Sequence, residues 1–359
     1  MIGQKRIPSR EGGVEIHVEE IAVRLAKMGN DVTVYNRRKK GFPLLHEYKG
    51  VKIVNVPTVD RKSLDAVVYS FLATIHALFG RYDVIHYHAE GPCSMLWIPH
   101  LFGIRTVATI HGLDWQRAKW GGFATKFLLF GEKTAAKYAD EIIVLSQNVR
   151  RYFGEKYHRQ TRYIPNGVSR PQIREANIVT KKYGLYKDGY LLFLARIVPE
   201  KGLHYLLEAF SKVPTDKKLV VAGASSHSNG YFEKIKETAQ KDDRVVMTGF
   251  VQGAELDELY SNAFLYVLPS DVEGMPLSLL EAMSYGCPCL VSDIPENTEV
   301  LGGCGFTFPK GNVRGMQRCL KVLLLRNDLS SVGVAGKRRV LTEYTWEKCV
   351  DQTIHCLAR

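Results

Sequence analysis

The chain has 359 residues, 45% hydrophobic and 24% charged, which is the composition of a soluble globular enzyme. That length exceeds one ordinary core, so we expect about two domains that need no disulfides. No apolar run reaches the about 18 residues of a membrane span, and the N-terminus has no apolar signal segment, so we expect a cytoplasmic protein. The seven cysteines include no CxxC pair, which favours reduced structural thiols over a zinc site.

The positive charge is concentrated in the first half of the chain. Of the net charge of +12, residues 1–170 supply a surplus of 11, from 26 Lys and Arg against 15 Asp and Glu. Residues 171–359 have 23 against 22. A basic surface of this kind fits nucleic acid, an anionic membrane face or phosphorylated substrates. Because no RNA- or DNA-binding motif accompanies the charge, we expect no nucleic-acid partner.

Strands and helices alternate along the first half. Only Met1 and Ile2 precede the loop GQKRIPSREGG, so either the first strand is short or the chain begins downstream of its natural start. Apolar residues then recur every three or four positions from Val14 to Met28, which predicts a helix that ends at Gly29. We expect strands in DVTVYN, VKIVNV, DVIHYH, RTVATIH and EIIVLS, and helices near 63–79, 93–102 and 123–138. Such alternation is typical of a parallel sheet with helices on both faces.

The alternation begins again after RYIPNGVSRP. Strands are expected in YLLFLA, KLVVAG, RVVMTGF, FLYVLPS and PCLVS, and helices in GLHYLLEAF, 231–240, AELDELYSNA and 276–285. The sequence therefore predicts two doubly wound α/β domains in tandem, joined near 165–175. Ligands of such domains bind at the carboxyl ends of the strands, so we expect a ligand between the two.

The segment ARIVPEKG places two cations, Arg196 and Lys201, in a loop between a strand and a helix. A helix N-terminus favours anions through its free N–H groups and its dipole, so this loop is a candidate diphosphate site. The alternative is a surface loop in which Glu200 pairs with one of the cations.

The segment DVEGMPLSLLEAMSYG carries two carboxylates, Glu273 and Glu281. Pro276 suits the first position of a helix that Gly286 ends, so Glu281 lies in the helix and Glu273 in the loop before it. A diphosphate repels both carboxylates, whereas sugar hydroxyls can donate hydrogen bonds to them. The alternative is that both side chains are simply solvated.

These two segments, together with REGGVEIHVEEIA, DVIHYH, TIHG and YIPNGV in this order, resemble the retaining sugar-nucleotide glycosyltransferases of family 4. The resemblance implies an α/β fold of the GT-B type, with two doubly wound Rossmann-like domains that face each other across a cleft. We expect an N-terminal acceptor-binding domain at 1–168, a nucleotide-sugar-binding domain at 169–344, and a last helix at 345–359 that packs back on the first domain.

The resemblance also assigns roles. Arg196 and Lys201 would hold the donor diphosphate and stabilise the leaving group, Glu273 would contact the transferred sugar, and Glu281 would bind the ribose. The remaining donor-binding residues would be Gly13, Gly249, Phe250, Val251, Gly274, Met275, Pro276 and Leu277. Many relatives have Phe-Gly where this chain has Met275 and Pro276, and Pro276 offers no N–H.

His111 ends a predicted strand, where a histidine is usually structural, but the resemblance places it against the transferred sugar as a catalytic residue. On the acceptor side we expect Gly12, His88 and Asn166, although a turn is an adequate explanation for Gly12 and Asn166. His88 is nearer the carboxyl end of its strand than His86. No further Cys/His cluster completes a zinc site with this pair. There is no DxD motif either, so we expect no metal and no cofactor beyond the nucleotide-sugar substrate.

Residues 115–138 combine aromatic and aliphatic side chains with Arg117, Lys119, Lys126, Lys133 and Lys137. This pattern fits a segment that lies at the inner face of the cell membrane, and equally an ordinary packing helix with a basic outer face. We therefore predict a retaining hexosyl-type glycosyltransferase whose acceptor is lipid-linked or a saccharide, in surface polysaccharide assembly. The alternatives are a GT-B sugar-nucleotide epimerase and a non-catalytic sugar-nucleotide-binding subunit.

Overall fold

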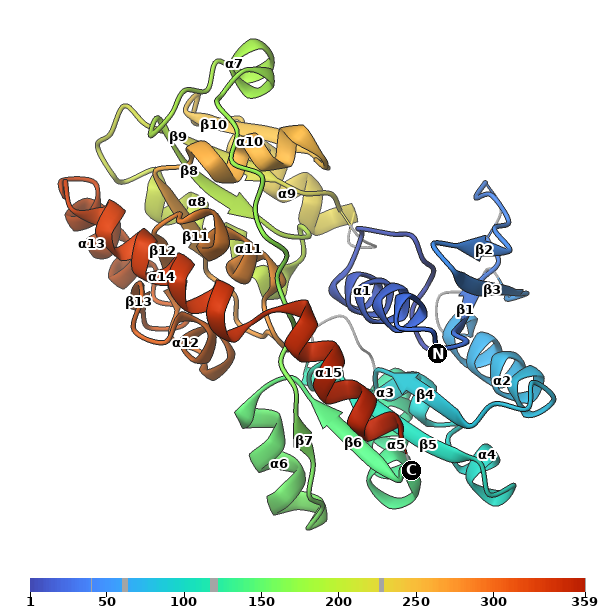
Figure 1. The fold of residues 1–359 in the computed structure, drawn as a ribbon. Coiled ribbons are helices and arrows are strands. Elements are labelled where there is room, and N and C mark those ends of the chain that lie inside the picture. Colours follow the sequence, from blue (N-terminus) through green and yellow to red (C-terminus); the bar gives the residue numbers. More distant parts are fainter. Residues whose placement is uncertain (40, 60–63, 117–121, 226–228, 359) are drawn as a thin grey trace. The chain divides into compact units, whose positions relative to one another are not determined.

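The computed structural model describes residues 1–39, 41–59, 64–116, 122–225 and 229–358 (Figure 1). The chain divides into two compact units. The first unit comprises Met1–Gly167 and Trp346–Arg359, and the second comprises Val168–Thr345. Each boundary lies within one residue of the position that we expected from the sequence.

The first unit contains two small sheets. One has the strand order β1-β3-β2 and the other the order β4-β5-β6-β7, and all neighbours are parallel except β2 and β3. The strands are β1 (Thr33–Arg37), β2 (Glu47–Tyr48), β3 (Val51–Val56), β4 (Val84–His88), β5 (Arg105–Ile110), β6 (Glu141–Val144) and β7 (Arg162–Tyr163).

Met1 and Ile2 lie between the two small sheets. The Ile2 N–H donates to the His86 carbonyl at 2.9 Å, and the Ile2 carbonyl accepts from the His88 N–H at 2.8 Å. On the other side, the Met1 carbonyl accepts from the Tyr35 N–H at 3.1 Å. A very short first segment therefore lies between β1 and β4, in the place of a central strand.

The helices of the first unit are α1 (Gly13–Lys27), α2 (Asp65–Leu78), α3 (Glu90–Cys93), α4 (Trp97–Leu101), α5 (Gly122–Tyr138), α6 (Gln147–Tyr157) and α15 (Trp346–Leu357), with a 3-10 turn η1 (Asp114–Gln116). The single helix expected near 93–102 is two short helices. Pro99 has no N–H with which to bond residue 95, so it interrupts a continuous helix and sits instead in the first turn of α4.

The last helix, α15, belongs to the first unit and packs on α1. Arg24 of α1 lies 3.6 Å from the Glu347 carboxylate, and the Arg105 guanidinium donates to the Cys356 carbonyl at 3.0 Å. The C-terminal segment thus returns to the domain in which the chain starts.

The second unit is built on one six-stranded sheet with the order β10-β9-β8-β11-β12-β13, parallel throughout (Figure 1). Its strands are β8 (Tyr190–Leu194), β9 (Lys218–Ala222), β10 (Val245–Gly249), β11 (Leu265–Leu268), β12 (Cys289–Ser292) and β13 (Phe306–Phe308). The chain first adds strands on one side of β8 and then continues on the other, so β8 and β11 flank a topological switch point, where doubly wound domains bind ligands.

Both faces of this sheet are buried. Along β8, Tyr190 and Leu192 belong to one hydrophobic cluster, whereas Leu191 and Phe193 belong to another. This explains the continuous apolar runs in the sequence. The covering helices are α7 (Ile178–Tyr183), α8 (Leu203–Phe210), α9 (Asn229–Ala239), α10 (Ala254–Asn262), α11 (Leu277–Tyr285), α12 (Pro295–Leu301), α13 (Val313–Leu323) and α14 (Leu329–Glu343), with a 3-10 turn η2 (Pro199–Lys201).

Candidate functional site

The predicted diphosphate and sugar residues meet at the switch point of the second unit. Arg196 and Lys201 lie in the loop after β8, and Glu273 lies in the loop after β11, the strand next to β8. The Lys201 Nζ is 2.5 Å from the Glu273 Oε1. Residues that are 72 positions apart in the sequence therefore form one ion pair at the carboxyl edge of the sheet.

Gly202 lets the two loops come this close. Its φ is +67°, and a Cβ at this position would lie 2.0 Å from the Pro269 carbonyl oxygen at the end of β11. A side chain is thus excluded both by the backbone conformation and by the neighbouring strand.

The ion pair is well shielded from solvent. The Lys201 and Glu273 side chains are 15% and 7% exposed, and the Ser270 hydroxyl donates to the same Glu273 oxygen at 2.6 Å. From the sequence we expected Lys201 to bind the diphosphate and Glu273 the transferred sugar. In the structure the two side chains bind each other, because opposite charges this close attract strongly in a partly desolvated site.

Glu281 is held by a tyrosine that the sequence did not reveal. The hydroxyl of Tyr260 on α10 donates to the Glu281 Oε2 at 2.9 Å. Burial, together with the Glu281 charge, raises the pKa of Tyr260 well above its usual value, which keeps this hydroxyl protonated as a donor. The Tyr260 ring stacks on that of Tyr285, with centroids 5.2 Å apart, so Glu281 sits in a fixed position at the middle of α11.

The other predicted donor-binding residues of the second unit lie near strand ends or the start of α11. From the sequence we expected Pro276 to be the first residue of the helix. It is instead the capping residue before the helix, with the extended values φ −79° and ψ 95°. Gly274 and Pro276 are buried, and Met275 and Leu277 are partly buried. Gly249 ends β10 with φ +74°, and it is followed by the half-exposed Phe250 and the partly buried Val251.

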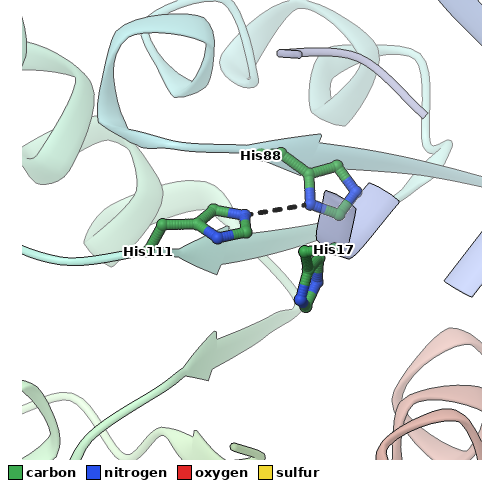
Figure 2. Close-up of side chains that lie close together, drawn as sticks. All are labelled: His17, His88 and His111. Atoms are coloured by element: carbon green, nitrogen blue, oxygen red, sulfur yellow. Dashed lines mark hydrogen bonds between the residues drawn. The ribbon is translucent and has the colours of Figure 1, made fainter. Parts of the chain in front are cut away.

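In the first unit, His88 and His111 occupy the carboxyl ends of adjacent strands. His88 is the last residue of β4, and His111 directly follows β5. The His88 Nδ1 and His111 Nε2 are 3.3 Å apart (Figure 2). His17, on α1, joins them: its ring centroid is 4.6 Å from that of His111 and 5.4 Å from that of His88.

Asn166 fixes the orientation of His17. The His17 Nδ1 is 2.7 Å from the Asn166 Oδ1, and both side chains are buried. Burial lowers the pKa of His17 to about 4 and that of His88 well below its usual value, so both imidazoles are neutral. Gly12 caps α1 and Gly13 is its first residue; Gly12 has an extended φ of −158° that any residue can adopt.

His86 lies on the same face of β4 as His88, since side chains two apart in a strand point the same way. Their ring centroids are 4.1 Å apart, and the His86 Nε2 is 2.7 Å from the Thr109 hydroxyl. From the sequence we saw no cluster that could join this pair, yet His17 and His111 both lie beside His88. His17 could have been found from the helical pattern, because it lies three residues after Val14, on the buried face of α1.

Three neighbouring helices of the first unit expose large apolar side chains. On α5, Phe123 and Phe130 are 70% and 53% exposed, beside the exposed Lys126, Lys133 and Lys137. The helices α2 and α4 contact each other, and α4 contacts α5. The further exposed apolar side chains on α2 and α4, or directly after these helices, are Phe71, Phe79, Trp97, Leu101 and Phe102.

The expected interfacial segment is only partly described. Arg117, Lys119 and Trp120 lie outside the described residues, and Trp115 points inward to donate to Glu132 at 3.0 Å. Across the part of the chain that the structure covers, no helix combines the length and the apolar character that crossing a bilayer requires.

Comparison with solved structures defines the class of fold. The chain resembles sucrose-phosphate synthase from Thermosynechococcus elongatus with a TM-score of 0.84 and 22% identity, over 96% of this chain and 92% of the other. It resembles HepE from Anabaena, in complex with UDP and glucose, with a TM-score of 0.82 and 16% identity, over 99% and 98% of the two chains. The fold is therefore GT-B.

Sequence comparison then gives the family. The profile described as "Glycosyltransferase Family 4" matches residues 11–170, and that described as "Glycosyl transferases group 1" matches residues 177–337. This chain belongs to the family 4, group 1 glycosyltransferases.

Among curated relatives, an O-antigen chain mannosyltransferase B from Escherichia coli is 27% identical over 54% of this chain, and the match spans half of that protein. A phosphatidyl-myo-inositol mannosyltransferase from Mycobacterium leprae is 27% identical over 95% of this chain and 91% of its own length.

Proposed function

We propose that this protein transfers a sugar from a nucleoside-diphosphate donor to a lipid-linked or saccharide acceptor, with retention of the anomeric configuration, in polysaccharide or glycolipid synthesis. The observation that carries the proposal is the contact between Lys201 and Glu273 at the switch point of the second unit. It brings a cation suited to a diphosphate and a carboxylate suited to sugar hydroxyls within one hydrogen bond of each other.

Binding of the donor would rearrange this ion pair. Lys201, with Arg196 on the same loop, would turn to the diphosphate and stabilise the negative charge that develops on the leaving group. Glu273 would then be released to accept hydrogen bonds from the sugar. The ammonium group thus passes from one anion to another, so neither charge is left without a partner in a poorly solvated site.

Glu281 would bind the ribose. Its Oε2 accepts a hydrogen bond from Tyr260, which holds the carboxylate in place, and a carboxylate can accept hydrogen bonds from ribose hydroxyls. The complex of HepE with UDP and glucose, in a chain of the same fold, supports a nucleotide sugar as donor. The two mannosyltransferases among the relatives support a hexose.

His111 would lie at the reacting sugar, with His88 and Asn166 on the acceptor side. With two cations and the N-terminus of α8 beside the diphosphate, charge neutralisation there needs no divalent metal. For retention we propose that the leaving phosphate itself accepts the proton of the incoming acceptor hydroxyl on the same face of the sugar.

A thermal-shift panel of nucleoside diphosphates tests the donor. One nucleotide should stabilise the full chain, because it binds only the folded state, and Lys201→Ala should abolish most of that shift. Lys187→Ala, an exposed lysine of the same unit, is the matched control and should leave the shift unchanged. If no nucleotide stabilises the chain, the proposal fails. NMR of the product from an α-linked donor tests retention, which a β-linked product would disprove.

We further propose that the exposed apolar side chains of α2, α4 and α5, with the lysines of α5, dock on an anionic membrane that carries the acceptor. Phenylalanines insert between lipids while flanking lysines contact headgroups. The chain should float with anionic vesicles at low salt and not with neutral ones. The double variant Phe123→Ser/Phe130→Ser should no longer float. The control variant Phe250→Ser, at an exposed position of the second unit, should float as the unmodified chain does.

A further inference from the structure

We propose that Tyr266 and Ser278 are positioning residues that fix the spacing between the two halves of the donor site in the second unit. The first half is the loop of Arg196 and Lys201, for the diphosphate, and the second is α11 with Glu281, for the ribose. This inference rests on the proposed function, and both residues act through the groups that bind the donor.

The Tyr266 hydroxyl joins the two halves directly. It lies 3.3 Å from the Leu194 carbonyl oxygen and 2.7 Å from the Ser278 hydroxyl oxygen. Leu194 is the last residue of β8, two positions before Arg196. Ser278 is in the first turn of α11, three positions before Glu281. A hydroxyl has one proton to donate and lone pairs that accept, so both contacts can form together.

The polar group of Tyr266 has a cost that these contacts offset. The residue is 0% exposed, and its ring lies in the hydrophobic cluster that the sheet shares with α11. A hydroxyl without a hydrogen bond in such surroundings destabilises a fold. A phenylalanine would bury the same ring with no polar group to satisfy, so what the tyrosine adds is the link between β8 and α11.

A second tyrosine contacts the same turn of α11. The Tyr260 hydroxyl, which donates to the Glu281 carboxylate, is also 3.4 Å from the Ser278 carbonyl oxygen. The Tyr260 and Tyr266 rings are neighbours, with centroids 6.3 Å apart. Tyr260 thus fixes the Glu281 side chain, and Tyr266 fixes the first turn of the helix that carries it. Burial raises the pKa of Tyr266 well above its usual value, and the charges of Glu273 and Glu281 raise it further, so the hydroxyl keeps its proton.

The spacing matters because one ligand has to reach both halves. In a nucleoside diphosphate the phosphates and the ribose are covalently joined, so the ligand itself sets the distance between them. A loop and a helix that are held at the matching separation bind both groups without losing further freedom, whereas movement between them costs affinity. A ligand that touches only one half does not depend on the spacing.

Titration calorimetry of the full chain tests the pair. UDP, GDP, ADP, CDP and dTDP are screened first, and the tightest binder is the probe. Tyr266→Phe and Ser278→Ala should each weaken its binding by about 3–10-fold in Kd, the effect of a lost hydrogen bond. Inorganic pyrophosphate, which reaches only the loop of Arg196 and Lys201, should bind both variants as it binds the unmodified chain. Because the two hydroxyls are partners, the double variant should lose no more affinity than Tyr266→Phe alone.

Two further variants separate positioning from stability of the fold. Ser278→Thr keeps the hydroxyl and should bind the nucleotide as the unmodified chain does. Tyr87→Phe removes a buried tyrosine hydroxyl that lies 3.0 Å from the Thr74 hydroxyl in the first unit, and it should leave nucleotide binding unchanged. Chemical unfolding should show that every variant is folded under the conditions of the titration.

An equal loss of affinity for pyrophosphate and for the nucleotide would mean that the hydroxyls support the fold in general, and the inference is then wrong. It is also wrong if the two single losses add in the double variant. If the unmodified chain binds a nucleoside diphosphate and both variants bind it as tightly, only this inference fails. If the unmodified chain binds none, the proposed donor is refuted as well.

Discussion

Glu273→Gln should strengthen the binding of a nucleoside diphosphate that carries no sugar. In the structure the Lys201 Nζ is 2.5 Å from the Glu273 carboxylate. A diphosphate that contacts Lys201 from its other side must compete with this carboxylate and is repelled by it. Glutamine keeps the size and a hydrogen-bond acceptor but removes the charge, so both unfavourable contributions disappear.

The magnitude follows from the geometry. A phosphate oxygen on the far side of the ammonium group would lie about 5 Å from the carboxylate, where the repulsion is about 3 kcal/mol at an effective dielectric constant of 20 and about 0.8 kcal/mol in water. With side chains 15% and 7% exposed, the site lies between these limits. We therefore expect a gain of about 1–2 kcal/mol, or about 5–30-fold in Kd.

Isothermal titration of the full chain at two salt concentrations measures the effect, which should shrink at high salt. Sugar transfer by the same variant should fall, because Glu273 no longer binds the sugar as an anion. Glu281→Gln removes an equal charge from a carboxylate bound to Tyr260, and it should weaken nucleotide binding instead. If Glu273→Gln lowers the affinity, Glu273 positions Lys201 for the diphosphate rather than competing with it, and our reasoning is wrong.

Three further predictions concern single contacts. Tyr260→Phe removes the hydrogen bond to Glu281 and should weaken nucleotide binding by about 1 kcal/mol; a 2′,3′-dideoxy nucleotide should show no such loss, and an equal loss would disprove the ribose role. Gly202→Ala should weaken nucleotide binding strongly, because its Cβ would meet the Pro269 carbonyl, whereas Gly303→Ala, also at positive φ but in open space, should not. Glu132 is fully buried and accepts hydrogen bonds from Trp115, Tyr152, Tyr157 and Lys156. Glu132→Ala should therefore lower the free energy of unfolding of the first unit by about 3 kcal/mol, measured by chemical unfolding. A loss no greater than that caused by Glu155→Ala, at an exposed position, would contradict this.

The sequence by itself determined most of the central strands and the class of fold. The four inner strands of the second unit, β8, β9, β11 and β12, are short apolar runs because they are buried on both faces, and this pattern needs no knowledge of their neighbours. The alternation with helices then allows little besides parallel, doubly wound sheets. The sequence also indicated where the candidate donor-binding residues lie. A loop after a strand lies at the carboxyl edge of the sheet, which places Arg196, Lys201 and Glu273 there, and the helical pattern places Glu281 on α11.

Only the tertiary structure decided which of these groups are partners. The sheet order places the loop after β8 next to the loop after β11, and so converts two separate motifs into the ion pair of Lys201 and Glu273. The same holds for Tyr260 with Glu281, and for His17 with His88 and His111. Local propensity reflects short-range sterics and hydrophobic period, whereas these contacts join residues far apart in the chain, whose proximity depends on strand order and helix packing.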